Sequence, residues 1–504
     1  MVLSISFHFF AAIQELGGHP SAVIFSYRMV IKMEFKTLSG NEYVYLPESG
    51  IVYPKKALKR FAEMERFLES IGSGKVNLDE IENPAIIKEL ILRNGLQELI
   101  LEMTQKCNLR CKYCVYSESY PGVRGYNPKD MSEDTALKAI DFYFSLLKEG
   151  RAYNPYREPS VAFYGGEPLL NFELIKTCIN HVIENYKDFS PHFVMTINGT
   201  LLSEEIVSFL SEHNCEIVLS IDGPKEEHDR NRVFPGGKGS FDIIMENAKL
   251  LAGSNIKVYC QSVYDLKTDI DNVHKFFYRE DVPLLSGASL VSTKIPNTYH
   301  DAFSAGDRKN YEERLAKMVE YQIEKVQKGS KKEIKRKENN GKGRISLYDL
   351  DLMNISALVL NRHIGNYKDP YIPFTSSGVP GFKLFVDAYG FLRICERTFG
   401  DVSIIGDVES GLDYEKILSI LQSLQSETAY CESCVAKNMC SLCYVTFASG
   451  PSIERNPTIC EDVQVRLEGT FSHVWSIAEI DESVLLELAR EYYTLFEDIG
   501  KELL

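Results

Sequence analysis

Apolar runs of strand length alternate with segments of helical period along the middle of the chain. The strand-length runs are Leu96 to Met103, Ser160 to Tyr164, His192 to Ile197, Glu216 to Ile221, Lys257 to Val263 and Leu284 to Val291. The helical segments between them are Glu133 to Leu147, Phe172 to Tyr186, Ser203 to His213, Phe241 to Ala252 and Asp271 to Phe277. This alternation predicts an α/β fold, with a parallel sheet and right-handed crossovers that closes wholly or partly into a barrel.

The pattern differs before the first of these strands. Two strand-like runs around a turn lie between Tyr43 and Tyr53, and helical stretches follow at Lys55 to Ile71 and Leu78 to Leu92. Residues 33–95 therefore read as a small hairpin-plus-helix module. Residues 1–32 form an uncertain extension: they begin apolar but lack the basic region of a signal peptide, and Met33 is a candidate start.

Composition narrows the classes of partner. The chain has 504 residues, 44% of them hydrophobic, which is enough for several domains with large cores. Its net charge of −15 disfavours nucleic acid, since phosphates call for a basic face. No run of eighteen apolar residues occurs, so no membrane span is expected. The basic stretch from Lys331 to Gly343 reads as a solvated linker, with binding of an acidic leader peptide as the alternative.

The cysteines carry the candidate chemistry. Cys107, Cys111 and Cys114 directly follow a predicted strand, and this spacing supplies three thiolates, which would leave one iron of a four-iron cluster open to a ligand. A zinc site is the rival, although zinc ribbons usually pair CxxC units. Six more cysteines lie in the last quarter of the chain, where metal ligation is favoured over disulfides in a reducing cytoplasm. They are Cys395, on a predicted hairpin, and Cys431, Cys434, Cys440, Cys443 and Cys460.

The three-cysteine run, with Tyr113 before its last member, resembles the signature of radical S-adenosylmethionine (SAM) enzymes. Three later segments follow other strands, as in that family: Tyr164 to Pro168, Thr196 to Gly199 and Ser220 to Pro224. The resemblance implies a partial (β/α)6 barrel that holds SAM and a 4Fe-4S cluster. It further implies contacts to SAM from Tyr113, Gly165, Gly166, Glu167, Asn198, Ser220, Asp222 and Arg232.

The downstream cysteines resemble a SPASM domain, the C-terminal extension of many radical SAM peptide-modifying enzymes. The resemblance assigns Cys395 and Cys443 to an inner auxiliary iron-sulfur cluster, and Cys431, Cys434, Cys440 and Cys460 to an outer one. The sequence departs from the pattern at Gly411, where a cysteine is expected. The inner cluster therefore borrows another side chain, keeps an open iron for a substrate thiolate, or is absent. Cys178, Cys215 and Cys260 read as small buried hydrophobic residues.

These resemblances imply the following organisation of the chain. The barrel spans 96–305, a helical and charged linker spans 306–368, the SPASM-like domain spans 369–466 and helices occupy 467–504. The module at 33–95 resembles a peptide-recognition element that adds a leader strand to a sheet edge, with a structural cap on the barrel as the alternative.

The leading expectation is a cytoplasmic peptide maturase that forms thioether crosslinks from cysteine sulfur to carbon in a precursor peptide. An electron donor such as flavodoxin or ferredoxin would serve it. Carbon-carbon crosslinking and formylglycine formation of the anaerobic sulfatase-maturase type are the alternatives within the family. A non-catalytic iron-sulfur redox sensor or scaffold and a zinc-binding interaction module are alternatives of other classes. The sequence names no acid or base that acts on the substrate.

Overall fold

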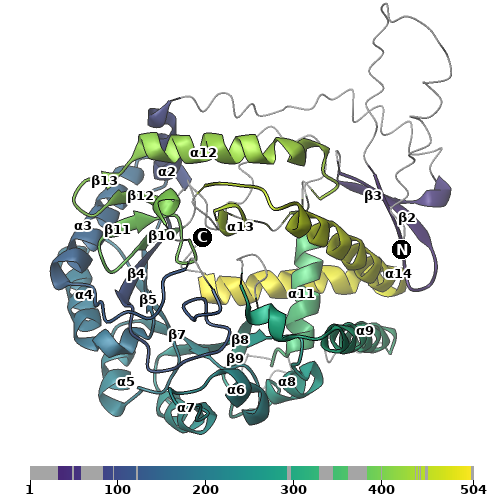
Figure 1. Ribbon diagram of the computed structural model, residues 1–504, viewed down its shortest axis with the longest axis horizontal. Coiled ribbons are helices and arrows are strands. Elements are labelled where there is room, and N and C mark those ends of the chain that lie inside the picture. The colour runs from purple at the N-terminus through teal and green to yellow at the C-terminus, as the bar shows by residue number, and fades with distance from the viewer. Residues whose placement is uncertain are drawn as a thin grey trace, which may run out of the picture.

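The computed structural model describes residues 32–47, 50–57, 83–94, 96–120, 123–291, 297–328, 344–360, 362, 383–398, 400–436, 439–440, 442, 444–448 and 452–500 (Figure 1). A ten-stranded sheet forms its centre, in the order β13-β12-β11-β10-β4-β5-β6-β7-β8-β9. Several parts of the chain for which the sequence made a prediction lie outside these ranges. They are residues 1–31, most of the helical stretch from Lys55 to Ile71, the basic stretch from Lys331 to Gly343, and Cys443.

All six predicted barrel strands are present, and each pairs in parallel with its neighbour. They are β4 (Glu98–Thr104), β5 (Ser160–Gly165), β6 (His192–Ile197), β7 (Cys215–Ser220), β8 (Lys257–Tyr264) and β9 (Leu284–Leu290). The crossover helices are α3 (Glu133–Gly150), α4 (Phe172–Asn185), α5 (Glu204–Ser211), α6 (Lys225–Asn231), α7 (Phe241–Ala248) and α8 (Ile270–Phe276). The fold is therefore the predicted partial barrel, with these helices on its outer side (Figure 1).

Side-chain alternation explains the layers of the barrel. On β4, Leu99 and Leu101 join the large core shared with the outer helices, whereas Ile100 joins a separate cluster with Ala162 and Phe385 on the opposite, inner face. The helices begin where their capping residues predict, since Ser132 and Ser203 each accept a backbone N–H from the first turn of α3 and α5.

A hairpin region from the C-terminal part of the chain extends the barrel sheet beyond β4. Strand β10 (Lys383–Val386) runs parallel to β4, and β11 (Phe391–Arg393), β12 (Ile404–Asp407) and β13 (Gly411–Leu412) follow in antiparallel order. Cys395 comes two residues after β11, so the predicted hairpin is confirmed. Residues almost 300 positions apart in sequence thus become neighbours in one sheet.

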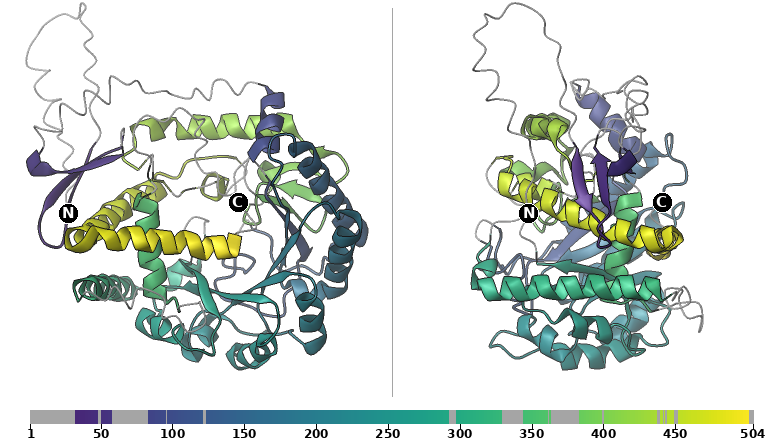
Figure 2. Two further views of the ribbon diagram at one scale, coloured as in Figure 1. Left: turned by 180° about the vertical axis from the view of Figure 1, so that it is seen from behind. Right: turned by 90° about the vertical axis from the view of Figure 1, so that its right-hand side faces the viewer.

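The N-terminal module contains the predicted hairpin, β2 (Glu42–Leu46) and β3 (Ile51–Pro54), and helix α2 (Pro84–Asn94). Sequence reasoning missed β1 (Met33–Lys36), which pairs with β2. This sheet packs on the C-terminal helix α14 (Pro457–Gly500), with the Phe35 and Phe471 ring centroids 5.3 Å apart, and both views of Figure 2 place the two side by side. The sheet of the module therefore lies on α14, whereas its helix α2 packs on the barrel helix α3, with Lys88 Nζ 2.8 Å from Glu149 Oε1.

Helices complete the C-terminal half. They are α9 (Ala305–Gln327), α11 (Leu347–Leu360), α12 (Tyr414–Thr428) and α13 (Tyr444–Phe447). Helix α11 is mostly buried against α14, so the segment expected to be a linker contributes to the core. Helix α14 bends at Asp481, which has non-helical φ and ψ angles. The short 3-10 turns are η2 (Lys55–Ala57), η4 (Pro168–Asn171), η5 (Lys249–Leu251), η6 (Tyr299–Ala302), η7 (Asp401–Ser403) and η8 (Ala429–Ser433). Within the described ranges, no helix has the length and apolar character needed to cross a membrane.

Candidate active site

The cysteine loop, residues 105–117, leaves the carboxyl end of β4. Its backbone is anchored on the end of α6 and the residues that follow, because Lys112 N donates to Asn231 O at 3.0 Å and Arg110 N donates to Val233 O at 2.7 Å. Active sites of parallel barrels form at this edge, where the strand ends meet. The structure therefore places the loop where neighbouring strand ends can contribute to one site.

The three thiols of this loop are free and partly exposed. Leu109 N donates to the Cys107 sulfur at 3.5 Å, a contact that stabilises a thiolate. Burial, with the nearby Glu167 carboxylate, raises the pKa of Cys107 to about 12, and burial also raises the pKa of Cys111. A metal or cluster that binds here must displace these protons, so its binding depends on pH.

Two glycines let β5 end directly against the cysteine loop. Gly165 has φ +133°, and a Cβ on it would lie 2.3 Å from Thr104 O, while a Cβ on Gly166 would lie 2.0 Å from Lys106 O. Glu167 N then donates to Lys106 O at 2.9 Å. Only glycine allows this close backbone approach, which positions Glu167 beside the loop.

The Glu167 carboxylate is only 1% exposed. It accepts backbone N–H groups from Asn198 at 2.8 Å and Leu169 at 3.3 Å. Burial raises its pKa to about 7, although both hydrogen bonds act in the opposite direction. The Asn198 side chain donates to Asn108 Oδ1 at 2.9 Å, and this bond joins the end of β6 to the cysteine loop. Two of the expected SAM contacts, Glu167 and Asn198, are thus adjacent.

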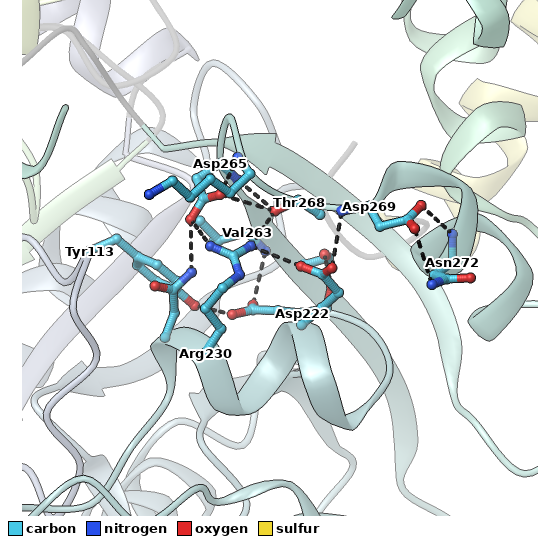
Figure 3. Close-up of polar contacts among 12 residues, drawn as sticks. Tyr113, Asp222, Arg230, Val263, Asp265, Thr268, Asp269 and Asn272 are labelled. Carbon is cyan, nitrogen blue, oxygen red and sulfur yellow. Dashed lines mark hydrogen bonds and ion pairs between the residues drawn. The ribbon is translucent and has the colours of Figure 1, made fainter. Parts of the chain in front are cut away.

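Asp222 contacts two more of the predicted residues, Tyr113 and Arg232, and its bond from Tyr113 is drawn in Figure 3. Tyr113 donates its hydroxyl to Asp222 Oδ2, Arg232 Nε lies 3.0 Å from Oδ1, and Val263 N also donates to Oδ1 at 3.0 Å. Burial alone would lower the pKa of Arg232, but the Asp222 carboxylate raises it, so Arg232 keeps its charge. Ser220 is the last residue of β7, two positions before Asp222.

A second polar network was missed by sequence reasoning. Asp265 follows β8 and accepts hydrogen bonds from Arg230, from Asn231 at 3.0 Å and from the Tyr299 hydroxyl at 2.7 Å. Burial would raise the pKa of Asp265, but these donors outweigh it and lower the pKa to about 2. The Tyr299 ring also meets the Tyr113 ring edge to face. The acid at a strand end was a usable sequence signal, whereas Tyr299 carried none.

Cys395 lies near the residues that follow Cys114 in the chain. It is 1% exposed and forms a small buried cluster with Tyr120 and Val445, against which Val115 packs. Arg397 N donates to the Cys395 sulfur at 3.3 Å, the same i+2 contact that Cys107 has. The structure therefore brings Cys395 next to residues that directly follow the first cysteine group.

The position where a further inner cysteine was expected holds Gly411 on β13. Its φ is +78°, and a Cβ there would lie 2.9 Å from the Phe142 ring. Gly411 pairs with Asp407 where β12 and β13 run antiparallel. No thiolate can come from this position. Cys178, Cys215 and Cys260 are buried at 0%, 4% and 0% exposure, in agreement with their reading as small hydrophobic residues.

The four cysteines predicted for the outer cluster lie together, although they come from three separate segments. Cys434, Cys440 and Cys460 are all close enough to Cys431 to influence its pKa, which burial raises to about 11. Ala436 N donates to the Cys434 sulfur at 3.4 Å, the third i+2 contact of this kind. We call these four residues the C-terminal cysteine group.

A zinc ion requires several ligand atoms at about 2.0–2.3 Å from one point. Among the residues that the structure describes, no group of three or more His, Cys, Asp or Glu side chains is arranged to hold a single metal ion. A 4Fe-4S cluster makes a different demand, because each thiolate binds its own iron and the sulfurs stand farther apart. Among the described residues, no cysteine is in a disulfide, as either use requires.

Comparison with known proteins decides the family of the barrel. Residues 101–272 match the Radical SAM superfamily. These residues form a radical SAM domain. Its similarity extends to a cysteine-type anaerobic sulfatase-maturating enzyme of Clostridium novyi, 31% identical over 38% of this chain and 50% of the relative. The radical SAM cyclopropyl synthase TigE of Paramaledivibacter caminithermalis is 24% identical over 43% of this chain and 46% of the relative. The chain thus spans about half the length of the curated relatives it matches.

Solved structures agree with the fold of the radical SAM domain and its extension. The structure is similar to that of anSMEcpe with bound AdoMet, with a TM-score of 0.57, 19% identity, and coverage of 79% of this chain and 98% of the other. A structure of anSMEcpe with bound AdoMet and Cp18Cys peptide gives a TM-score of 0.54 at 19% identity, over 78% of this chain and 99% of the other. At this identity the likeness shows the fold alone.

A radical SAM domain implies SAM and a 4Fe-4S cluster, and the residues at the barrel mouth fit both. Three free thiols with a preformed N–H···S contact suit a cluster with one open iron. SAM carries an ammonium, a carboxylate and ribose hydroxyls. A buried carboxylate at Glu167, a retained positive charge at Arg232 and the acceptor Asp222 match these three groups in charge and hydrogen bonding.

Proposed function

We propose that this protein is a radical SAM maturase that oxidises a ribosomally made precursor peptide and joins a cysteine sulfur to a carbon of another residue. When bound, SAM and the reduced cluster on Cys107, Cys111 and Cys114 supply a deoxyadenosyl radical that removes a hydrogen atom from substrate carbon. The chain's own residues hold SAM: Tyr113, Gly165, Gly166, Glu167, Asn198, Ser220, Asp222 and Arg232.

The observation that carries this proposal is the position of Cys395. It is buried against Tyr120 and Val445, beside the continuation of the SAM-site cysteine loop, in the sheet extension next to β4. Because Gly411 supplies no thiolate, an inner cluster on Cys395 and Cys443 would lack a protein ligand that a substrate thiolate could replace. A substrate cysteine thiolate that bound there would be held on the side of the barrel where the carbon radical forms.

Thioether formation needs an electron acceptor. Loss of one hydrogen atom from carbon and one proton from sulfur, followed by bond formation, leaves one electron to be removed. The C-terminal cysteine group, with an auxiliary 4Fe-4S cluster bound, is the acceptor we propose, and a small carrier such as flavodoxin or ferredoxin would exchange electrons with the protein.

The N-terminal sheet is the proposed site for the leader of the peptide. In the described part of this module, β1 and β3 are edge strands, because each pairs with β2 alone. An extended peptide can add to such an edge through backbone hydrogen bonds. The sheet is held firmly on α14, where Glu479 accepts bonds from Thr37, Asn41 and Tyr43.

The similarity to sulfatase-maturating enzymes favours a second candidate, oxidation of a peptide cysteine to formylglycine. This reaction would use the same SAM site but would replace the substrate sulfur by oxygen. Intact mass and free-thiol count separate the candidates after anaerobic reaction of a cysteine-rich precursor peptide with reconstituted enzyme, reductant and SAM. Loss of two hydrogens and one thiol per event supports a thioether. Loss of two hydrogens with all thiols kept indicates a carbon-carbon bond, and loss of sulfur indicates formylglycine.

A further inference from the structure

We propose that Gln464 and Arg455 tune the C-terminal cysteine group to accept electrons, by donating hydrogen bonds and positive charge to the thiolates of Cys434 and Cys460. The inference rests on the proposed function in one respect, that these four cysteines hold an iron-sulfur cluster. It adds the two side chains that set the reduction potential of that cluster.

Gln464 reaches the group from helix α14. Its side-chain Nε2 donates to the Cys434 sulfur at 3.4 Å. Gln464 is four residues after Cys460 in the same helix, so the two side chains lie on one face, one turn apart. The helix therefore supplies a ligand and a donor to the same site, and Cys434 accepts two N–H groups, one from Gln464 and one from Ala436.

Arg455 approaches from the segment before α14. Its side chain donates a hydrogen bond to the Cys460 sulfur, and its charge lies close enough to Cys431 to act on that sulfur as well. The guanidinium stacks over the Tyr430 ring at 4.2 Å, and the Arg455 backbone N–H donates to Glu427 Oε2 at 2.9 Å. These two contacts hold the positive charge beside the group.

Donors and cations change a cluster's reduction potential in a known direction. Reduction adds a negative charge that spreads onto the sulfurs, so an N–H donor or a guanidinium stabilises the reduced form more than the oxidised form and raises the potential. A cluster on the C-terminal cysteine group should therefore be easier to reduce than it would be without Gln464 and Arg455.

The test is a potentiometric titration followed by electron paramagnetic resonance, on full-length protein reconstituted with iron and sulfide. A parent variant with Cys107, Cys111 and Cys114 changed to Ala removes the signal of the SAM site, and adding Cys395→Ala removes the inner site. Gln464→Leu, Arg455→Gln and Arg455→Lys are then compared in this parent. Arg466→Gln is the matched control, since Arg466 is an exposed arginine on the same helix.

We expect Arg455→Gln to lower the ratio of reduced to oxidised cluster at fixed solution potential roughly tenfold, about 59 mV for one electron. Gln464→Leu should lower it by a smaller factor, on the order of threefold. Arg455→Lys, which keeps the charge, and Arg466→Gln should stay near the parent. Unchanged or raised potentials in both neutral variants, at equal iron content, overturn the inference alone. A parent that assembles no cluster overturns it together with the auxiliary site of the proposed function.

Discussion

The two cysteine groups of this protein are built in different ways. Cys107, Cys111 and Cys114 lie within eight residues on one loop, whose backbone is bonded to the end of the α6 segment. The C-terminal cysteine group draws Cys431 from η8, Cys434 from the residue directly after η8, Cys440 from the following loop and Cys460 from α14. The first group is thus local in the chain, whereas the second exists only after α14 has docked.

Their surroundings differ as well. The barrel group has acidic and basic neighbours, with Glu167 near Cys107 and the Asp222–Arg232 pair near Cys111. This mixture suits a zwitterionic, charged cofactor. The C-terminal group has Gln464 and Arg455 as side-chain neighbours, which suit extra negative charge on sulfur. The contrast supports the proposed division, with binding and chemistry in the barrel and electron acceptance at the C-terminal cysteine group.

The largest expected effect comes from removing a ligand of the barrel group. Cys107→Ala should abolish SAM cleavage, because the cluster that reduces SAM loses one of its three thiolates. Deoxyadenosine release, measured by chromatography after anaerobic incubation with reductant, is the readout. Cys178→Ala, a buried cysteine of α4, is the control and should keep cleavage. Cleavage that survives in Cys107→Ala would remove this loop from the chemistry.

A ligand change in the C-terminal group should separate the two sites. We expect Cys434→Ala to leave part of the SAM cleavage but to stop crosslink formation, since the substrate radical then has no electron acceptor. Deoxyadenosine and peptide mass are measured in the same reaction. Full crosslinking by this variant would exclude the C-terminal group from the mechanism.

Glu167→Gln should weaken SAM binding roughly tenfold to a hundredfold while iron content stays the same, since hydrogen bonds to charged groups are worth about 1.5–3 kcal/mol. The measurement is SAM affinity by equilibrium dialysis beside iron analysis, with Glu173→Gln, an exposed acid of α4, as control. An equal loss of iron and of SAM would make Glu167 a structural residue.

The raised pKa of Glu167 gives the same interaction a pH dependence. Below its pKa of about 7 the buried carboxyl is protonated and cannot pair with the SAM ammonium. Wild-type SAM affinity should therefore rise as pH increases from 6 to 7. Glu167→Gln should lose this rise. A flat wild-type profile would contradict the pairing.

The smallest effect is expected at the Asp265 network. Asp265→Asn should lower the free energy of unfolding at pH 7 by about 2 kcal/mol, because it weakens bonds from Arg230, Asn231 and Tyr299. The folded pKa of about 2 lies below the ordinary 3.8, so this stability is present above pH 4 and is lost as pH falls toward 2. Denaturant unfolding at several pH values measures both, with exposed Asp242→Asn as control.

The sequence by itself determined the barrel and the members of the site at its mouth. Strand and helix periods are local properties, and parallel strands bring their carboxyl ends to one edge, so the cysteine loop, Glu167, Asn198 and Asp222 were expected as neighbours. Close spacing of Cys107, Cys111 and Cys114 made their grouping independent of the rest of the fold.

Only the tertiary structure decided the contacts between segments that are far apart in the chain. Packing places Cys395 beside the cysteine loop through the sheet extension, and it docks the N-terminal sheet on α14. Packing also brings the Tyr299 hydroxyl to Asp265 and the Gln464 side chain to Cys434. No periodic pattern encodes such contacts, because their partners are chosen by the shape and burial of whole elements and not by neighbours in sequence.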